Sequence, residues 1–327
     1  MPSSGQLAGA YGGNPLRVLT FGETMALMRS TDVGPIAHSA SLRLGIGGSE
    51  SNVAIALRRL GVAVTWVGRV GADGFGELVG RELRAEGVDA TVICDESAPT
   101  GLMVKERRTS EAGRVWYYRS ASAGSRLQPA DITDGDIAAA SLVHLTGITP
   151  ALSASALETT GDVVARARAA GVTVSFDLNY RRALWSPAAA GAVYRDLIPM
   201  VDIVFGGDEE LAMAVGAGSP EQLAERILAS GPREAVVKLG AAGAVGANAK
   251  QLIHAPAVPV TVVDSVGAGD GFVAGYLAEF LAGADLERRL KTATTVGAFA
   301  CTGEGDWESL PRRDELSLLA SSEPVSR

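Results

Sequence analysis

Residues 264–272 read DSVGAGDGF and lie between the apolar run Val258–Val263 and a helical pattern. The run is rich in β-branched valine, which favours a strand. After the glycines, Phe272, Tyr276 and Phe280 recur at the spacing of one helix face. Glycines between a strand and a helix permit a tight turn and a close approach of the backbone to a ligand. The stretch therefore predicts a strand–turn–helix unit with a candidate ligand site at the turn.

The rest of the chain alternates short β-rich runs with helical segments. This alternation predicts a mostly parallel sheet that is covered by helices on both faces. Expected strands lie at residues 17–21, 62–67, 141–146, 172–177, 201–205 and 234–239. Expected helices lie at residues 49–60, 75–86, 153–170, 188–198, 208–230 and 286–300. Ser49 is the expected N-cap of the first helix.

Residues 30–46 and 88–120 interrupt this alternation. They contain alternating segments such as Thr100–Lys105 and Arg114–Arg119 but no helical pattern. We expect them to form a small β-sheet that projects from the main sheet as a lid, the alternative being two ordinary surface hairpins. An exposed edge of such a lid favours pairing between subunits, so we expect a homo-oligomer formed through the lid.

The composition argues against a nucleic-acid-binding protein and against a membrane protein. The 327 residues contain 29 Lys and Arg against 37 Asp and Glu, and an acidic chain of this kind is a poor nucleic-acid binder. No apolar stretch is long enough to span a membrane, and the first residues lack the features of a signal peptide. We expect a cytoplasmic protein with one domain over residues 16–320, flanked by flexible tails at 1–15 and 321–327.

The turn itself suggests a reaction. Gly267, Ala268 and Gly269 can direct successive backbone amides at one point at a helix N-terminus, which makes an anion site. Asp270 would repel an anion there, unless it accepts a proton from a hydroxyl group that attacks a bound phosphoryl group. The alternatives are that Asp270 only caps the helix, or that the turn is a GxGxxG dinucleotide loop, which would need glycine at Phe272. The pattern favours phosphoryl transfer to an alcohol.

These residues resemble the sequence motifs of a known family. DSVGAGDGF resembles the D-[ST]-x-G-A-G-D-x-F signature of the ribokinase-like (PfkB) carbohydrate kinases. GGSESNVA at 47–54 is similar to the sugar-side helix motif of that family, and residues 67–76 match a third motif. The resemblance spans roughly residues 17–311. It implies a ribokinase-like three-layer α/β/α domain with a mostly parallel central sheet and a small β-sheet lid, with ATP as phosphoryl donor and Mg²⁺ as helper.

The resemblance also implies roles for individual residues. Asp270 would be the general base, with the amides of Gly267, Ala268 and Gly269 as the anion hole. Gly48 and Asn52 would contact the sugar. The nucleotide would lie along a strand–turn–strand segment and against the 286–300 helix; the segment contributes Lys238, Gly240, Ala241 and Gly243.

Two arginine-containing segments bear on the substrate. Arg119 follows Tyr117 and Tyr118, and Arg181 lies in a D-x-N-x-R-x-x-L-W segment. Two arginines that converge on one cleft suit a carboxylate, which arginine can grip with two hydrogen bonds. Both segments resemble 2-keto-3-deoxygluconate kinases within the family, and the second is also similar to fructokinases. The alternative for Arg119 is a solvated charge on an edge strand.

On that resemblance, further residues would line the sugar-acid pocket. Tyr117 would hold the acid end with Arg119; Ile148 would line the pocket with Arg181, and Asp306 would bind a hydroxyl near the reacting end. Met103 stands where those kinases tend to carry a tyrosine.

A second departure from the family pattern concerns the metal. The family usually reads N-x-x-E around its magnesium waters, whereas this chain has Gly207 in place of the asparagine and keeps the acid as Glu210. We expect Glu210 to reach Mg²⁺ through water.

Together these features predict an ATP-dependent kinase that phosphorylates the terminal hydroxyl of 2-keto-3-deoxygluconate, giving the 6-phosphate. The first alternative is a fructokinase or another PfkB sugar kinase. The second is a non-catalytic sugar-binding regulatory protein on the same fold. The intact Asp270 argues against the second alternative.

Overall fold

The computed structural model describes residues 16–109 and 113–320. The expected tails at 1–15 and 321–327 lie outside the described residues. None of the helices in the described part of the chain has the length and apolarity that a membrane span requires.

The main sheet has nine strands in the order β13-β12-β11-β10-β9-β8-β1-β4-β5. Every pair from β11 to β5 is parallel, and β12 and β13 extend one edge with antiparallel pairs. The strands are β1 (Arg17–Phe21), β4 (Ala63–Gly71), β5 (Asp89–Asp95), β8 (Leu142–Thr146), β9 (Thr173–Asp177), β10 (Ile203–Gly207), β11 (Glu234–Lys238), β12 (Ala244–Asn248) and β13 (Leu252–Ala255). The predicted mostly parallel sheet is confirmed.

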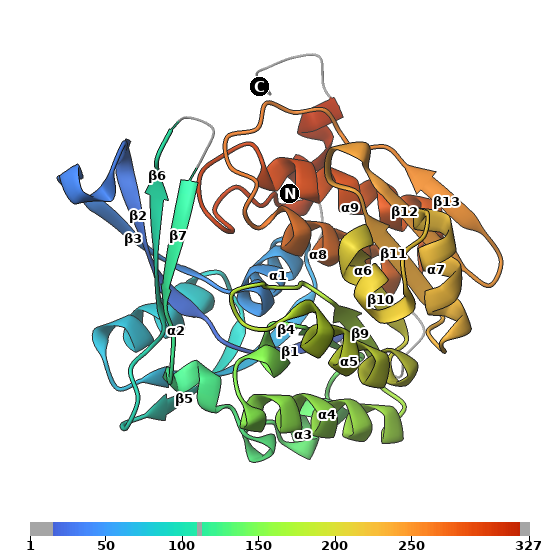
Figure 1. Cartoon of the computed structure of the whole chain (residues 1–327), viewed down its shortest axis with the longest axis horizontal. Coiled ribbons are helices and arrows are strands. Elements are labelled where there is room, and N and C mark those ends of the chain that lie inside the picture. Colours follow the sequence, from blue (N-terminus) through green and yellow to red (C-terminus); the bar gives the residue numbers. More distant parts are fainter. Residues whose placement is uncertain (1–15, 110–112, 321–327) are drawn as a thin grey trace, which may run out of the picture.

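Helices cover both faces of this sheet, so the domain has three α/β/α layers (Figure 1). One buried apolar cluster draws on α1 (Ser49–Arg59), α2 (Gly74–Ala85), α8 (Ala268–Leu281) and α9 (Leu286–Ala300). The other draws on α3 (Asp134–Ala138), α4 (Ala154–Ala169), α5 (Pro187–Leu197), α6 (Asp208–Val215) and α7 (Pro220–Ala229). Because both faces are buried, the parallel strands are mainly apolar.

A separate four-stranded sheet stands at the left of Figure 1, in the order β3-β2-β6-β7. Its strands are β2 (Met25–Val33), β3 (Leu42–Gly47), β6 (Leu102–Arg107) and β7 (Gly113–Tyr118). It therefore begins earlier than residue 30, and residues 89–95 of the expected 88–120 segment belong to the main sheet instead. The reason is that β4, α2 and β5 form one parallel β–α–β unit.

The strand expected at Val258–Val263 is absent. The segment is irregular, and the side chain of Val262 is 63% exposed. Pro256 and Pro259 carry no amide hydrogen, so the chain cannot continue a ladder of backbone hydrogen bonds past β13.

The single helix expected at 208–230 is two helices, α6 and α7. Gly216 adopts a left-handed conformation with φ of 81° and ends α6. Ser219 then caps α7, whose first residue is Pro220, a residue favoured at helix starts.

The strand order of the main sheet indicates where a ligand site is expected. It reverses between β1 and β8, and ligands of open α/β sheets bind beyond the carboxyl ends of the strands at such a reversal. The chain leaves β1 at Phe21 and enters the small sheet four residues later at Met25. The small sheet therefore begins at the carboxyl end of β1, where the strand order reverses.

Candidate active site

Asp270 lies in the first turn of α8 and is 7% exposed. Its Oδ1 accepts a hydrogen bond from Ser49 Oγ at 2.6 Å, and its Oδ2 accepts one from Asn52 Nδ2 at 2.8 Å. Asn179 Nδ2 lies 3.5 Å from Oδ1 and donates to Ser49 Oγ at 2.7 Å. These bonds run to α1 and to the loop after β9, whereas a capping carboxylate would bind the amides of its own helix. The structure thus brings together Asp270 and Asn52, two residues singled out in separate sequence motifs.

Gly267 precedes α8 in a left-handed conformation with φ of 77°. A Cβ atom at this position would overlap the carbonyl oxygen of Asp306, so only glycine fits. The amides of Gly269 and Asp270 have no acceptor among the described residues, as expected in the first turn of a helix. With the helix dipole they form a cradle for an anion, here called the α8 cradle (residues 267–270).

Lys238, at the end of β11, reaches this cradle. Its Nζ lies 3.7 Å from the position that a Cβ of Gly269 would take. The same ammonium donates to both carboxylate oxygens of Asp177, at 2.6 and 2.7 Å. Burial raises the pKa of Asp177 to about 6, although the charge of Lys238 opposes the rise. A buried cation therefore stands beside the α8 cradle.

The turn after Lys238 is open to solvent. Gly240 and Ala241 are exposed in the turn that joins β11 to β12, while Gly243 is buried with φ of 95°. Of the residues predicted to bind the nucleotide, Gly240 and Ala241 are therefore accessible to solvent, whereas Lys238 is mostly covered.

Asp306 is the second buried carboxylate of the site, 6% exposed. It has no side-chain hydrogen bond within the described part of the chain. A Cβ on Gly47 would overlap both Met103 Cε and Asp306 Oδ2, so these two predicted residues lie side by side over Gly47. Burial raises the pKa of Asp306 to about 7, while the ammonium of Lys105 opposes the rise.

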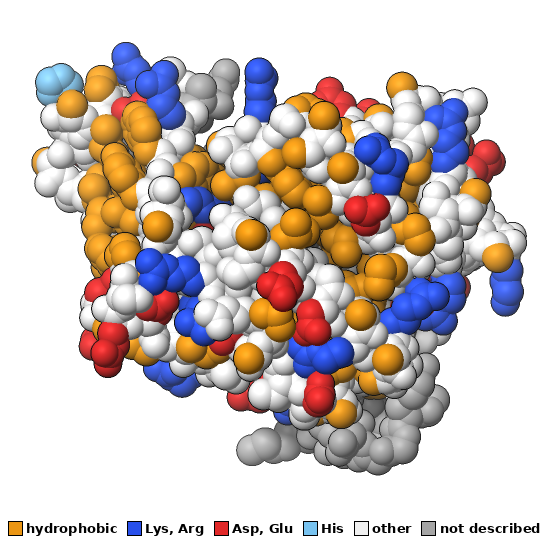
Figure 2. All heavy atoms as spheres, turned by 60° about the horizontal axis from the view of Figure 1, so that its bottom comes forward, with side chains coloured by type: hydrophobic (Ala, Val, Ile, Leu, Met, Phe, Trp, Pro, Cys, Tyr) orange, Lys and Arg blue, Asp and Glu red, His pale blue; other side chains and the backbone are white. Residues whose placement is uncertain are grey.

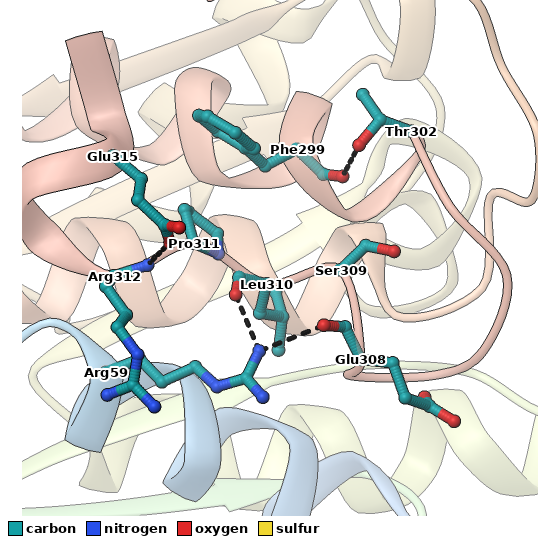
Figure 3. A pocket seen from close by; sticks show the side chains of 9 residues that line it. All are labelled: Arg59, Phe299, Thr302, Glu308, Ser309, Leu310, Pro311, Arg312 and Glu315. Carbon is teal, nitrogen blue, oxygen red and sulfur yellow. Dashed lines mark hydrogen bonds between the residues drawn. The ribbon is translucent and has the colours of Figure 1, made fainter. Parts of the chain in front are cut away.

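Arg59, near the end of α1, holds the segment that carries Asp306 (Figure 3). Its Nη1 donates to the carbonyls of Trp307, Glu308 and Leu310 at 3.1, 3.1 and 2.6 Å. Its other nitrogens pair with Glu86. Arg59, which lines a pocket of about 370 Å³ at this place, therefore holds the 307–310 segment against α1.

Arg119 does not carry a solvated charge, so the edge-strand alternative is wrong. Its Nε donates to Glu23 Oε2 at 2.7 Å, and its Nη2 forms an ion pair with the same oxygen at 2.5 Å. The side chains are 11% and 1% exposed. Ser122 donates to the other oxygen of Glu23. The charge of Arg119 is thus compensated by a buried partner that the sequence did not assign.

The remaining predicted substrate residues lie on three different segments of the chain. Tyr117 is 45% exposed and pairs with Met103 across β6 and β7. Ile148 is buried at the end of β8, and Arg181 is exposed in the loop after β9. Within the described residues no contact joins Arg181 to Arg119, and their predicted convergence on one cleft stays a prediction.

Glu210 accepts two backbone amides, and its predicted contact with Mg²⁺ through water stays a prediction. Its Oε1 accepts the amide of Tyr180 at 2.8 Å, and its Oε2 accepts that of Gly207 at 2.7 Å. Across residues 16–109 and 113–320, no three His, Cys, Asp or Glu side chains gather as metal ligands.

Three residues of the site escaped prediction as functional residues. Ser49 was expected to cap α1, but Gly48 occupies the N-cap position and the Ser49 hydroxyl bonds to Asp270. A Cβ on Gly48 would overlap the backbone oxygen of Glu23, which explains the glycine. Asn179 and Glu23 each follow the carboxyl end of a parallel strand, and that position is the signal that could have found them.

Comparisons with known proteins agree with this geometry. A model of the pfkB family carbohydrate kinases matches residues 16–313. The chain is 35% identical over 313 residues to 2-dehydro-3-deoxygluconokinase of Bacillus subtilis (strain 168), covering 94% of this chain and 96% of that protein. It is 34% identical over 309 residues to 2-dehydro-3-deoxygluconokinase of Thermoproteus tenax, covering 93% and 94%. The crystal structure of a PfkB protein from Polaromonas sp. JS666 is similar with a TM-score of 0.85 at 36% identity, covering 92% of this chain and 99% of that one.

Proposed function

Because the chain belongs to the pfkB family of carbohydrate kinases, and is therefore a sugar kinase of an ATP-dependent family, we propose that its acceptor is 2-keto-3-deoxygluconate. The γ-phosphoryl group of ATP would move to the terminal hydroxyl and give the 6-phosphate and ADP. The observation that carries this proposal is the Asp270 carboxylate, held by α1 at the mouth of the α8 cradle. Two relatives of similar length carry the name of this activity.

The chemistry follows from the positions of the polar groups. Asp270 accepts the hydroxyl proton as the new O–P bond forms and the bond from phosphorus to the ADP oxygen breaks. The cradle amides and Lys238 stabilise the negative charge on the transferred group. Asn52 Oδ1 is buried without a partner among the described residues, which leaves an acceptor for a sugar hydroxyl.

Magnesium would act through the nucleotide. The nearby carboxylates are already engaged, Asp177 by Lys238 and Glu210 by backbone amides. A Mg²⁺ ion would therefore be held chiefly by ATP phosphates and water, with these carboxylates as its outer neighbours. Bound there, it would neutralise phosphate charge.

The acid end of the sugar would lie under the small sheet. Arg119 Nη1 makes no hydrogen bond to any described residue and can donate to a carboxylate, while Glu23 fixes the rest of the guanidinium. Because Glu23 cancels the charge of Arg119, the net positive charge for a sugar acid must come from Arg181, which is exposed.

Arg181→Ala is expected to raise the KM for 2-keto-3-deoxygluconate about tenfold, the loss of one exposed charge-assisted contact, and that for fructose less than about twofold. A coupled ADP-release assay over ketoses, aldoses and sugar acids measures both effects. Arg119→Ala is a poorer probe because it leaves Glu23 buried without its partner.

The matched control is Arg182→Ala, the neighbouring exposed arginine. A wild-type enzyme that prefers fructose over every sugar acid would overturn the substrate assignment and support a fructokinase. Absence of turnover with every sugar would support the regulatory alternative.

The small sheet also supports our proposal of a homo-oligomer. Register places Leu44, Met28, Val104 and Trp116 in one row across its four strands. Leu44 is 49% exposed, and Figure 2 shows apolar side chains gathered over the small sheet at the left. An apolar sheet face of this kind is rare on monomers, so we propose that a second copy covers it.

Leu44→Lys is expected to convert a dimer into monomers, because it places a charge on the exposed apolar face. Light scattering over a range of protein concentrations measures the mass. Leu157→Lys, at an exposed apolar position on α4, is the control and should leave the mass unchanged. A wild-type protein that is monomeric at every concentration would exclude the dimer.

A further inference from the structure

Several ion pairs join the small sheet to the segments around the α8 cradle, and two of them start from β6. Lys105 of β6 pairs with Asp264, with side chains 13% and 16% exposed. Arg107, two residues along the same strand, pairs with Glu304 at 2.6 Å, with side chains 38% and 45% exposed. The first pair is therefore largely removed from water, while the second lies at the surface.

The partner of Lys105 shapes the entrance to the cradle. Asp264 Oδ2 binds the ammonium, while its Oδ1 accepts the amide of Val266 at 3.2 Å in the turn that leads to Gly267. Lys105 also acts on the charge of Asp306, whose carbonyl packs against Gly267. The ammonium of Lys105 is thus adjacent to the two segments that form the rim of the cradle.

There is room for an incoming group at this place. A cavity of about 450 Å³ is lined by Lys105 and Arg107 on the small sheet and by Asp264, Ser265 and Val266 on the other side. A cation that faces a cavity beside an anion cradle has a second possible partner besides its carboxylate.

We propose that Lys105 is a catalytic residue, which leaves Asp264 when ATP binds and donates to the oxygens of the transferred γ-phosphoryl group. Lys238 approaches the cradle from the main sheet and Lys105 from the small sheet, so the full positive charge is assembled only when the small sheet lies over the site. Closure of that sheet is thereby coupled to the chemical step. The inference rests on the proposed anion role of the α8 cradle and is independent of which sugar is phosphorylated.

Lys105→Met is expected to lower kcat by roughly 10²- to 10³-fold, the range for loss of one donor to developing charge, with the KM for the sugar little changed. Lys105→Arg keeps a charge and is expected to lose less than about tenfold. Each rate is measured with the sugar that the wild type phosphorylates fastest, so an error in the sugar assignment leaves this test intact.

Calorimetry with ADP and with the β,γ-imido analogue of ATP separates a catalytic role from a structural one. Lys105→Met should weaken binding of the analogue, which carries a third phosphate, and leave ADP binding unchanged. Arg114→Met removes an exposed cation from the neighbouring strand β7, outside the lining of this cavity, and is the matched control, with kcat within about twofold of wild type. Equal losses in the two methionine variants, or equal weakening of ADP and the analogue, would overturn the proposal.

Discussion

Asp270→Asn is expected to lower kcat by about 10²- to 10⁴-fold, the contribution of a general base, while KM for sugar and ATP stays near the wild-type value. Asparagine has the same shape and can keep contacts with Ser49 and Asn52, but it cannot take up the proton of the attacking hydroxyl. Steady-state kinetics, with circular dichroism as a check on folding, measures the effect.

Asp285→Asn is the control that distinguishes the loss of a general base from the loss of a helix N-cap. Asp285 is a true N-cap, because its carboxylate accepts the amide of Arg288 at the start of α9. Its loss should lower the free energy of unfolding by about 1 kcal/mol and leave kcat unchanged. If Asp270→Asn behaves in the same way, Asp270 is a cap and the proposed mechanism fails.

Asp306→Asn is expected to stabilise the protein at pH 8, by up to about 4 kcal/mol in the free energy of unfolding. Burial raises the pKa of Asp306 to about 7 in the folded protein, against 3.8 without burial. A raised pKa contributes stability below pH 3.8, and this contribution is lost as the pH rises through 7. The wild type therefore carries the cost of a buried negative charge at pH 8, and the variant does not.

Denaturant unfolding at pH 5 and pH 8 tests this expectation. The advantage of the variant should be clearly smaller at pH 5, where the carboxyl is protonated in the folded state. Asp89→Asn, at an exposed position, should show no such gain at pH 8. A variant that is less stable than wild type at both values would mean that the carboxylate has a stabilising partner. We expect turnover to fall in the variant despite the gain in stability, because Asp306 borders Gly267.

The fold could be predicted from the sequence where periodicity and turn residues agree. The helix at 268–281 follows from aromatic spacing after a glycine turn, and α9 was placed at its observed bounds. The strand at Val258–Val263 was wrong because apolar β-branched composition was weighed without the two prolines that prevent pairing. A single helix at 208–230 was wrong because Gly216 was not recognised as a stop.

The site was predictable only in part, because side-chain partners are chosen by tertiary packing. Asp270 and Asn52 belong to motifs, and the structure brings them into contact, while their roles stay predictions. Glu23 and Arg119 are separated by 96 residues, and no local pattern links a residue after β1 to one after β7. The pairing of Lys105 with Asp264 is likewise a product of how the two sheets meet.

The contact between α1 and α8 can form only late in synthesis of the chain. Asp270 binds Ser49 and Asn52 across 221 and 218 residues of sequence. A ribosome releases α1 long before it has translated α8, so the nascent protein holds donors whose acceptor does not yet exist. On the proposed mechanism, an interrupted translation product that lacks α8 and the Asp306 segment would be unable to transfer phosphate from ATP.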